Sequence, residues 1–129
     1  MRTNGVIVGI TARHDDDPIM PQDKTFRKSM PITRGLLDYF PLACAYVAHV
    51  SFMANEQHNP GEPMHWARDK SGDHADCIPR HLVERGTFDD DDLRHTGKVA
   101  WRSMALLQEE LEEAGFGGPG LASVFGEEG

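Results

Sequence analysis

The most constraining feature of this sequence is a row of small and apolar residues with helical spacing near the C-terminal end. The row recurs at alternating intervals of four and three residues: Leu93, Gly97, Ala100, Met104, Leu107 and Leu111. Such a heptad-like row lies on one side of a helix and provides a surface for packing against other helices. It predicts a long helix over about Asp90–Ala114, which the run of aspartates at its start would favour electrostatically.

A second helix is predicted over residues 41–57. Pro41 suits its first position, where a missing N–H costs nothing, and Asn59-Pro60-Gly61 should end it. One face of this helix recurs at intervals of three and four residues: Leu42, Ala45, His49, Phe52 and Glu56. The polar residues His49 and Glu56 interrupt that face, so they are candidates for something other than packing.

A third helix should begin near Ser71 or Asp73 and run to about Arg85. Pro79 lies inside this span and is expected to kink or divide the helix. Together the predicted helices indicate an all-α fold, a three- to four-helix bundle-like domain over residues 31–114. The chain has 129 residues, enough for one domain.

The two ends of the chain are predicted to lie outside this domain. Residues 1–30 read as an irregular arm, with an isolated β-prone run at 6–10 and a polar His14-Asp15 pair. Residues 115–129 are rich in glycine and predict a flexible tail. The exception would be docking of its apolar residues on a neighbouring subunit: Leu121, Val124 and Phe125.

Composition excludes several classes of function. The net charge is −8, which argues against a nucleic-acid duplex as partner because phosphate neutralisation needs a basic surface. A small phosphate ligand stays possible when a metal ion lies between it and acidic side chains. No apolar run approaches the roughly 20 residues of a membrane span, and no signal peptide is evident. We expect a cytoplasmic protein with a modest core, completed by oligomerisation. Cys44 and Cys77 suit small core positions.

The chemically informative residues are polar side chains on the faces where helices should meet. Asp73 and Asp76 on the third helix, with Glu56 on the second, form an acidic group. The basic group comes from the third and last helices: Arg80, His81, His95, Lys98 and Arg102. Carboxylates that hold Mg²⁺ opposite cations that meet phosphate oxygens would suit a metal–phosphate ligand.

Each of these residues also has a purely structural interpretation. Acids at the start of a helix are favoured simply by its dipole, and Lys98 and Arg102 could form ordinary surface pairs. Trp66 suits a core or interface anchor, but it could instead stack on a base. The basic group 24–28 is usually a solvated arm and less often a phosphate contact through Lys24.

Four stretches in this order resemble the phage-borne dATP/dGTP diphosphohydrolase N-terminal-domain family. They are GLLDYFPLACAYVA, NEQHNPGEPMHWARDKS, DHADCIPRHLVERG and LRHTGKVAWRSMALLQEELE. The resemblance covers about residues 28–114, and NPGEPMHW and DHADCIPRHL are its specific parts. It implies an α-helical protein of the MazG-like nucleotide pyrophosphohydrolase type. Such proteins hydrolyse a nucleoside triphosphate to the monophosphate and pyrophosphate, use Mg²⁺ or Mn²⁺, and assemble as dimers or tetramers with sites between subunits.

The resemblance also suggests roles for the candidate residues. MazG-like enzymes commonly carry ExxE and ExxD, of which this chain matches only the second, as Asp73-x-x-Asp76. The expected metal ligands are Glu56, Asp73 and Asp76. Charge on the pyrophosphate leaving group would be stabilised by Lys98, Arg80 and Arg102. His81 or His95 could orient the phosphate or carry a proton, and Trp66 or His65 could stack on the purine.

Other classes of function stay open. The chain could be a nucleotide-binding module without catalysis, or a helical assembly protein whose acidic faces only solvate it. A metal phosphohydrolase of the HD type would need His and Asp ligands on helices, and His49, His74, Asp76 and His81 do not form a convincing set. The departure from the ExxE pattern leaves room for a chain that has lost catalysis.

Overall fold

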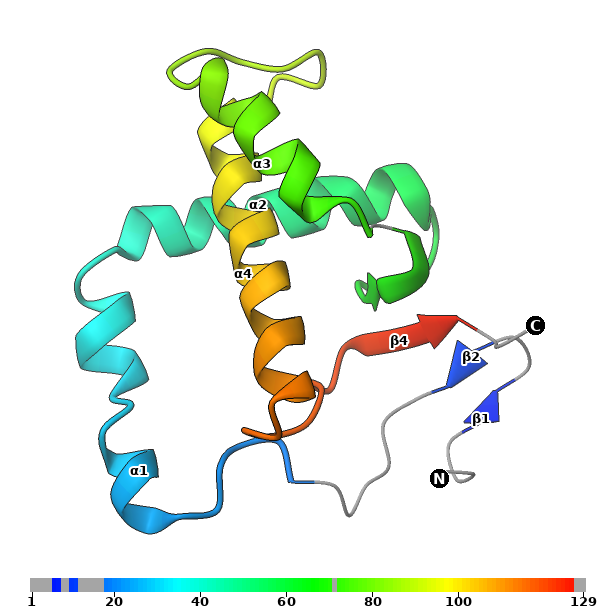
Figure 1. Cartoon of the computed structure of the whole chain (residues 1–129). Helices are drawn as coiled ribbons and strands as arrows, with labels where there is room; N and C mark the ends of the chain where they lie inside the picture. Colours follow the sequence, from blue (N-terminus) through cyan, green and yellow to red (C-terminus); the bar gives the residue numbers. More distant parts are fainter. Residues whose placement is uncertain (1–5, 8–9, 12–17, 71, 127–129) are drawn as a thin grey trace.

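The computed structural model describes residues 6–7, 10–11, 18–70 and 72–126 (Figure 1). The chain is mainly helical, which confirms the predicted all-α class. The helices are α1 (Lys24–Lys28), α2 (Pro41–His58), α3 (His74–Val83) and α4 (His95–Glu113), with a π-helical turn η1 (Thr33–Leu37) and a 3₁₀ turn η2 (Arg68–Lys70).

Helix α4 is the centre of the fold, because both α2 and α3 pack against it. In Figure 1 it runs through the middle of the molecule while α2 crosses it and α3 lies alongside its first half. Gly97 permits the approach of α2, since a Cβ atom there would lie 2.6 Å from the ring of Tyr46. The Tyr46 hydroxyl also accepts the backbone N–H of Arg94 at 2.8 Å, beside the start of α4.

The predicted apolar row on α4 is covered only over its first part. Leu93 and Gly97 are buried, whereas Met104 and Leu107 are each 54% exposed. The buried hydrophobic core of the described residues is correspondingly small: Val50, Cys77, Leu93 and Ala105. The modest core expected from composition is therefore what the described chain has.

Both ends of α2 lie close to where the sequence predicted them. Pro41 is its first residue, Asn59 follows its last turn, and Gly61 adopts the left-handed backbone (φ 81°) that a glycine tolerates. Pro79 does not divide α3, which runs on through it as a single helix.

The start of α4 differs from the prediction. The helix begins at His95 rather than near Asp90, and the aspartate run forms a loop closed by a bridge between Phe88 and Arg94. Asp92 takes a left-handed conformation in this loop (φ 64°), which Asp adopts more readily than most residues. The physical reason is tertiary: two of the aspartates are bound by a lysine, as described below, so they do not serve the helix N-terminus.

A small sheet joins the two ends of the chain. Its strands are β1 (Val6–Ile7), β2 (Ile10–Thr11), β3 (Trp66–Ala67) and β4 (Ser123–Gly126). They lie in the order β1-β2-β4-β3, with β3 and β4 parallel and the other pairs antiparallel. Residues predicted as an irregular arm and a flexible tail are therefore partly paired with each other. Val124 pairs with Ala67 of the same chain.

The glycines of the predicted tail have a packing role. A Cβ atom on Gly117 would collide with the carbonyl oxygen of Ile19, and the Gly118 N–H donates to that oxygen at 3.2 Å. Gly118 and Pro119 are buried. These glycines let two backbone segments touch, so the composition that suggested flexibility here serves close contact.

Arg68 connects the sheet to α4. Its guanidinium donates to both carboxylate oxygens of Glu112, at 2.9 and 2.6 Å, and to the Ser123 hydroxyl at 2.9 Å. The same group lies 3.8 Å from the centre of the Trp66 ring. The two charged side chains are only 7% and 16% exposed, so this ion pair is shielded from solvent.

Among the described residues no single helix is both long and apolar enough to span a membrane. By length and composition alone, the segment Lys24–Leu37 would qualify together with α2, but a bend of 92° separates the two.

Candidate functional site

A cavity of about 410 Å³ lies where the end of α2, β3, α3, the aspartate loop and α4 come together. Four basic side chains line it: Lys70, Arg80, Lys98 and Arg102. Only two carboxylates do so, those of Asp89 and Asp91. The wall of the cavity is thus positive in a chain whose net charge is −8.

Buried Asn55 shapes the turn that leads from α2 into the cavity wall. Its side-chain amide donates to the carbonyl of Glu62 at 3.1 Å, and its oxygen accepts from the Asn59 side chain at 3.2 Å and the His65 N–H at 3.4 Å. These bonds hold the 59–65 turn against the helix end and place His65 and Trp66 in the wall. Sequence reasoning missed Asn55, because its neighbour Glu56 fitted the expected spacing better.

Two tryptophans form the apolar side of the cavity. The rings of Trp66 and Trp101 meet edge to face, with centroids 5.9 Å apart. The Trp101 N–H donates to the Ser51 hydroxyl at 2.7 Å. The Trp66 N–H is buried and has no hydrogen-bond partner among the residues that the structure describes. Because Arg68 covers one face of Trp66, a base could stack only on the other face.

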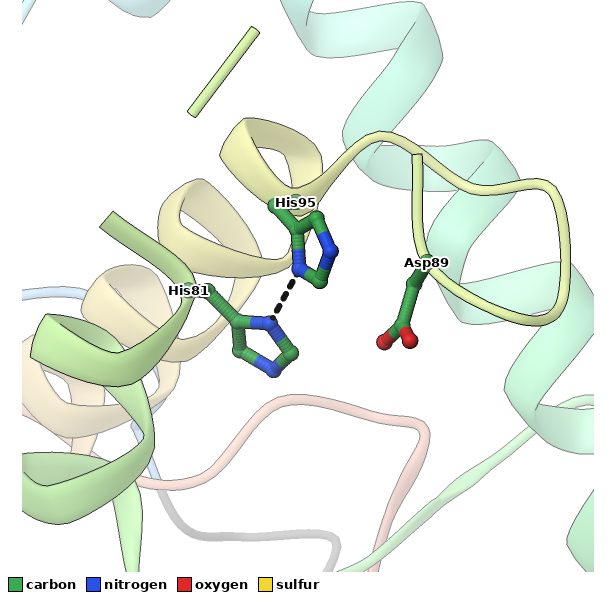
Figure 2. A group of neighbouring side chains, drawn as sticks. All are labelled: His81, Asp89 and His95. Atoms are coloured by element: carbon green, nitrogen blue, oxygen red, sulfur yellow. Dashed lines mark hydrogen bonds between the residues drawn. The ribbon is translucent and has the colours of Figure 1, made fainter. Parts of the chain in front are cut away.

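His81, Asp89 and His95 form a compact group beside the cavity (Figure 2). They come from α3, the loop and the first residue of α4, and their ligand atoms lie within 4.8 Å of one another. The two imidazole Nδ1 atoms are 2.8 Å apart, and both histidines are buried. Within the described chain this is the one group of histidine and carboxylate side chains whose geometry could hold a metal ion.

Lys98 organises the charges of this group. Its ammonium donates to Asp89 at 2.6 Å and to Asp91 at 2.7 Å. The bond from Lys98, with the Asp90 N–H, lowers the pKa of Asp89 to about 2. Burial lowers the pKa of His81, and the nearby charges of Arg80 and Lys98 lower it further. His81 is therefore a neutral imidazole near neutral pH, with a lone pair to offer.

The structure brings together six of the residues that the sequence singled out. The cavity is lined by His65, Trp66, Arg80, His81, Lys98 and Arg102. His95 does not line the cavity but contacts His81 behind the wall. Lys24 lies on α1 and is not part of the lining. The convergence of the basic group follows from the packing of α3 on α4.

The predicted acidic metal site is not assembled. Glu56 is exposed on α2 and does not line the cavity. Asp73 is also exposed, and it accepts bonds from the Cys77 thiol at 3.2 Å and from Arg102 at 3.1 Å. Asp76 is exposed on α3. Among the described residues these three carboxylates form no group that could bind a metal ion, because α2 turns Asn55 rather than Glu56 inward.

The HD-type alternative is not assembled either. His49 is exposed on α2 and stacks on Phe52, so it does not join His74 or His81. The His14-Asp15 pair lies outside the described residues.

His74 predicts a pH dependence of stability. This side chain is 2% exposed, and burial lowers its pKa below 6.5, although Glu109 opposes the shift. Since the unfolded chain takes up this proton more readily than the folded chain, the free energy of unfolding should fall as pH drops below about 6.5. The slope from one such group approaches about 1.4 kcal/mol per pH unit at most.

Urea unfolding of the wild type and of His74→Gln at several pH values between about 7 and 5 would measure this. The free energy of unfolding should fall less steeply with decreasing pH in the variant than in the wild type. His81 should account for part of the fall that remains in the variant. Equal declines in the two proteins would contradict the assignment.

Comparison with protein-family models, with curated proteins and with solved structures finds no match.

Proposed function

We propose that the cavity binds a nucleoside or deoxynucleoside triphosphate and that the chain hydrolyses it, with a divalent metal ion, to the monophosphate and pyrophosphate. The observation that carries the proposal is one cavity that joins two tryptophans to four basic side chains. The resemblance to dATP/dGTP diphosphohydrolases favours purine deoxynucleotides as substrates. It also favours a role in phage nucleotide metabolism, in the cytoplasm of the host.

The basic side chains suit the triphosphate. Arg80 is exposed, and the hydrogen bond from its guanidinium that the structure records goes to the Cys77 sulfur at 3.3 Å. Sulfur is a weak acceptor, so a phosphate oxygen would be the better partner for this guanidinium. Arg102 is held by Asp73 and Lys98 by two aspartates, which fixes their positions. Preorganised cations of this kind stabilise charge that develops on a leaving phosphate.

The other side of the cavity suits a base. Arg68 covers one face of the Trp66 ring, and a purine could stack on the other face. The apolar side chains of Val50, Met64 and Leu93 add to this part of the lining.

The expected ion, Mg²⁺ or Mn²⁺, would neutralise phosphate charge and polarise a water molecule. The chain's own contribution would be to hold the phosphates in line with Arg80, Lys98 and Arg102 and to exclude bulk water with the tryptophans. The oxygen ligands that Mg²⁺ prefers are not gathered at Glu56, Asp73 and Asp76 within the described part of one chain, whereas the resemblance implies a site built between subunits.

That disagreement favours one alternative, a module that binds nucleotides without hydrolysing them. Ligands that bind only the folded state raise its melting temperature. A melting shift with dGTP or dATP and Mn²⁺, but no pyrophosphate, would support the binding module. A helical assembly protein would show neither a shift nor a product.

Arg80→Ala tests the proposal directly. Loss of a charge-assisted contact to phosphate should raise KM for dGTP about tenfold or more, measured by pyrophosphate release with Mn²⁺. Arg85→Ala is the matched control, since Arg85 is exposed just beyond α3 and does not line the cavity. Equal KM values for the two variants would remove the phosphate assignment.

We further propose that the chain assembles as a dimer or tetramer. Large apolar side chains are exposed along η1, α2 and the segment between them: Leu37 (45%), Tyr39 (70%), Phe40 (52%), Leu42 (84%) and Phe52 (51%). Exposed apolar surface of this extent marks an interaction site. Sedimentation velocity should show an oligomer, which Leu42→Glu should dissociate without loss of helix content. A monomeric wild type at micromolar concentration would contradict this.

A further inference from the structure

We propose that His81, Asp89 and His95 bind a divalent transition-metal ion directly, and that Glu84 orients His95 for this role. This ligand set differs from the acidic group that the sequence suggested. The proposal stands on the geometry in Figure 2. It deepens the proposed function by naming the metal centre beside the nucleotide cavity, yet metal binding can be measured without any nucleotide.

The contact between the two histidines is the first support. Their Nδ1 atoms lie 2.8 Å apart, and the side chains are 4% and 6% exposed. Two nitrogen lone pairs cannot face each other at this distance, so one proton must lie between the rings. A metal ion that accepts both lone pairs would take the place of that proton, which would move to Nε2 of His81 as this neutral ring changes tautomer. Paired imidazoles are common metal ligands, because each neutral ring offers a nitrogen lone pair.

Glu84 supplies the second support. Its carboxylate lies 2.8 Å from Nε2 of His95. Nε2 therefore carries the hydrogen, and Nδ1, on the side of His81, is left with the lone pair. A carboxylate that fixes the tautomer of a histidine in this way is the usual partner of a metal-bound imidazole. The Glu84 side chain is 60% exposed, so it can be changed without disturbing the core.

The charges around the group form the third support. Asp89 is ionised and bound by Lys98, which also holds Asp91. If an ion takes an oxygen of Asp89, Lys98 keeps its bond to Asp91. The three carboxylates of Glu84, Asp89 and Asp91 would then face a divalent ion and Lys98, with the exposed guanidinium of Arg80 also nearby. The charge of a dication bound here would be largely offset by these carboxylates.

The ligand types indicate which ions fit. Imidazole suits Zn²⁺ and related transition metals, whereas Mg²⁺ requires oxygen ligands. Two histidines and one carboxylate leave further coordination positions open, as in catalytic zinc sites, where a water molecule or a substrate oxygen completes the shell. Because His81 also lines the cavity, an ion held here would lie next to the proposed phosphates. In this arrangement His81 is a metal ligand rather than a proton carrier.

Titration with Zn²⁺ by calorimetry, and with Co²⁺ by visible absorption, tests the proposal on the tag-free chain. The wild type should bind one ion per chain, with Mg²⁺ in large excess failing to compete. His81→Gln and His95→Gln should each weaken binding by at least about 100-fold, and Glu84→Gln by about 10- to 100-fold. His49→Gln is the matched control: His49 is exposed on α2, outside both the group and the cavity, and this variant should bind zinc as the wild type does.

No binding by the wild type, or equal affinity in His81→Gln and the wild type, would overturn the assignment. Circular dichroism checks that each variant folds, and the exposed Glu84 variant keeps the test decisive if a buried histidine proves essential for folding. A failed titration would leave the nucleotide proposal intact, because nucleotide binding is measured separately.

Discussion

His81→Gln is expected to lower kcat for dGTP hydrolysis by at least about 100-fold, because a ligand of the proposed metal ion is lost. His81 is the buried imidazole that belongs both to the cavity wall and to the His81–Asp89–His95 group. The change would remove a nitrogen ligand of the proposed ion and, with it, the positioning of the water that the ion would polarise. Steady-state pyrophosphate release with Mn²⁺ or Zn²⁺ measures the effect.

Two comparisons keep this result specific. His49→Gln changes an exposed histidine of α2 that lies outside the cavity, and it should leave kcat unchanged. Arg80→Ala should act mainly on KM, because it removes a phosphate contact rather than the reacting centre. A folded His81→Gln protein with wild-type kcat would show that this group has no part in the reaction.

Arg68→Met is expected to lower the free energy of unfolding by about 3 kcal/mol. The substitution leaves the carboxylate of Glu112, which is 16% exposed, without its bidentate partner. It also removes the bonds from Arg68 to Ser123 and the guanidinium that covers Trp66. Since these contacts join β3, β4 and α4, the loss should be felt by the whole domain. Urea unfolding followed by circular dichroism at 25 °C measures it.

The matched control is Arg85→Met, an exposed site where the change should stay within about 0.5 kcal/mol. Adding Glu112→Gln to Arg68→Met should recover part of the loss, because the cost comes largely from the remaining buried charge. A loss below about 0.5 kcal/mol for Arg68→Met alone would mean that the ion pair contributes no more than a surface pair.

The fold was predictable where local chemistry decides it. The signals at the two ends of α2, Pro41 and Gly61, act through backbone preferences of one or two residues, so the sequence alone places the helix. The start of α4 was missed because Asp89 and Asp91 could serve a helix N-terminus or bind a cation. Lys98 decides between these by a contact that only the folded chain makes.

The packing of the glycine-rich end was not predictable for a similar reason. Glycine signals flexibility when nothing touches it and close contact when a backbone does, and the sequence does not distinguish the two. Gly117 meets the carbonyl of Ile19, nearly one hundred residues earlier in the chain. Long-range contacts of this kind carry no local signature.

In the candidate site, too, some features were predictable from the sequence and others depend on contacts of the folded chain. The basic residues Arg80, Lys98 and Arg102 were expected to converge because packed helices bring their facing sides together, and the structure places all three in one cavity. Glu56, Asp73 and Asp76 do not gather within the described chain, because α2 turns Asn55 inward and leaves Glu56 exposed. The His81–Asp89–His95 group was missed since Asp89 comes from a loop. The available signal was that His81 and His95 flank one short connection between two packed helices.

The most direct test of the central claim is ³¹P NMR of dGTP and dATP incubated with the wild-type chain and Mn²⁺ or Zn²⁺. We predict that the triphosphate signals disappear while those of the nucleoside monophosphate and pyrophosphate grow in equal amounts, and that Arg80→Ala slows this conversion at low substrate concentration. Formation of diphosphate and inorganic phosphate, or persistence of the triphosphate with every metal ion, would contradict the account.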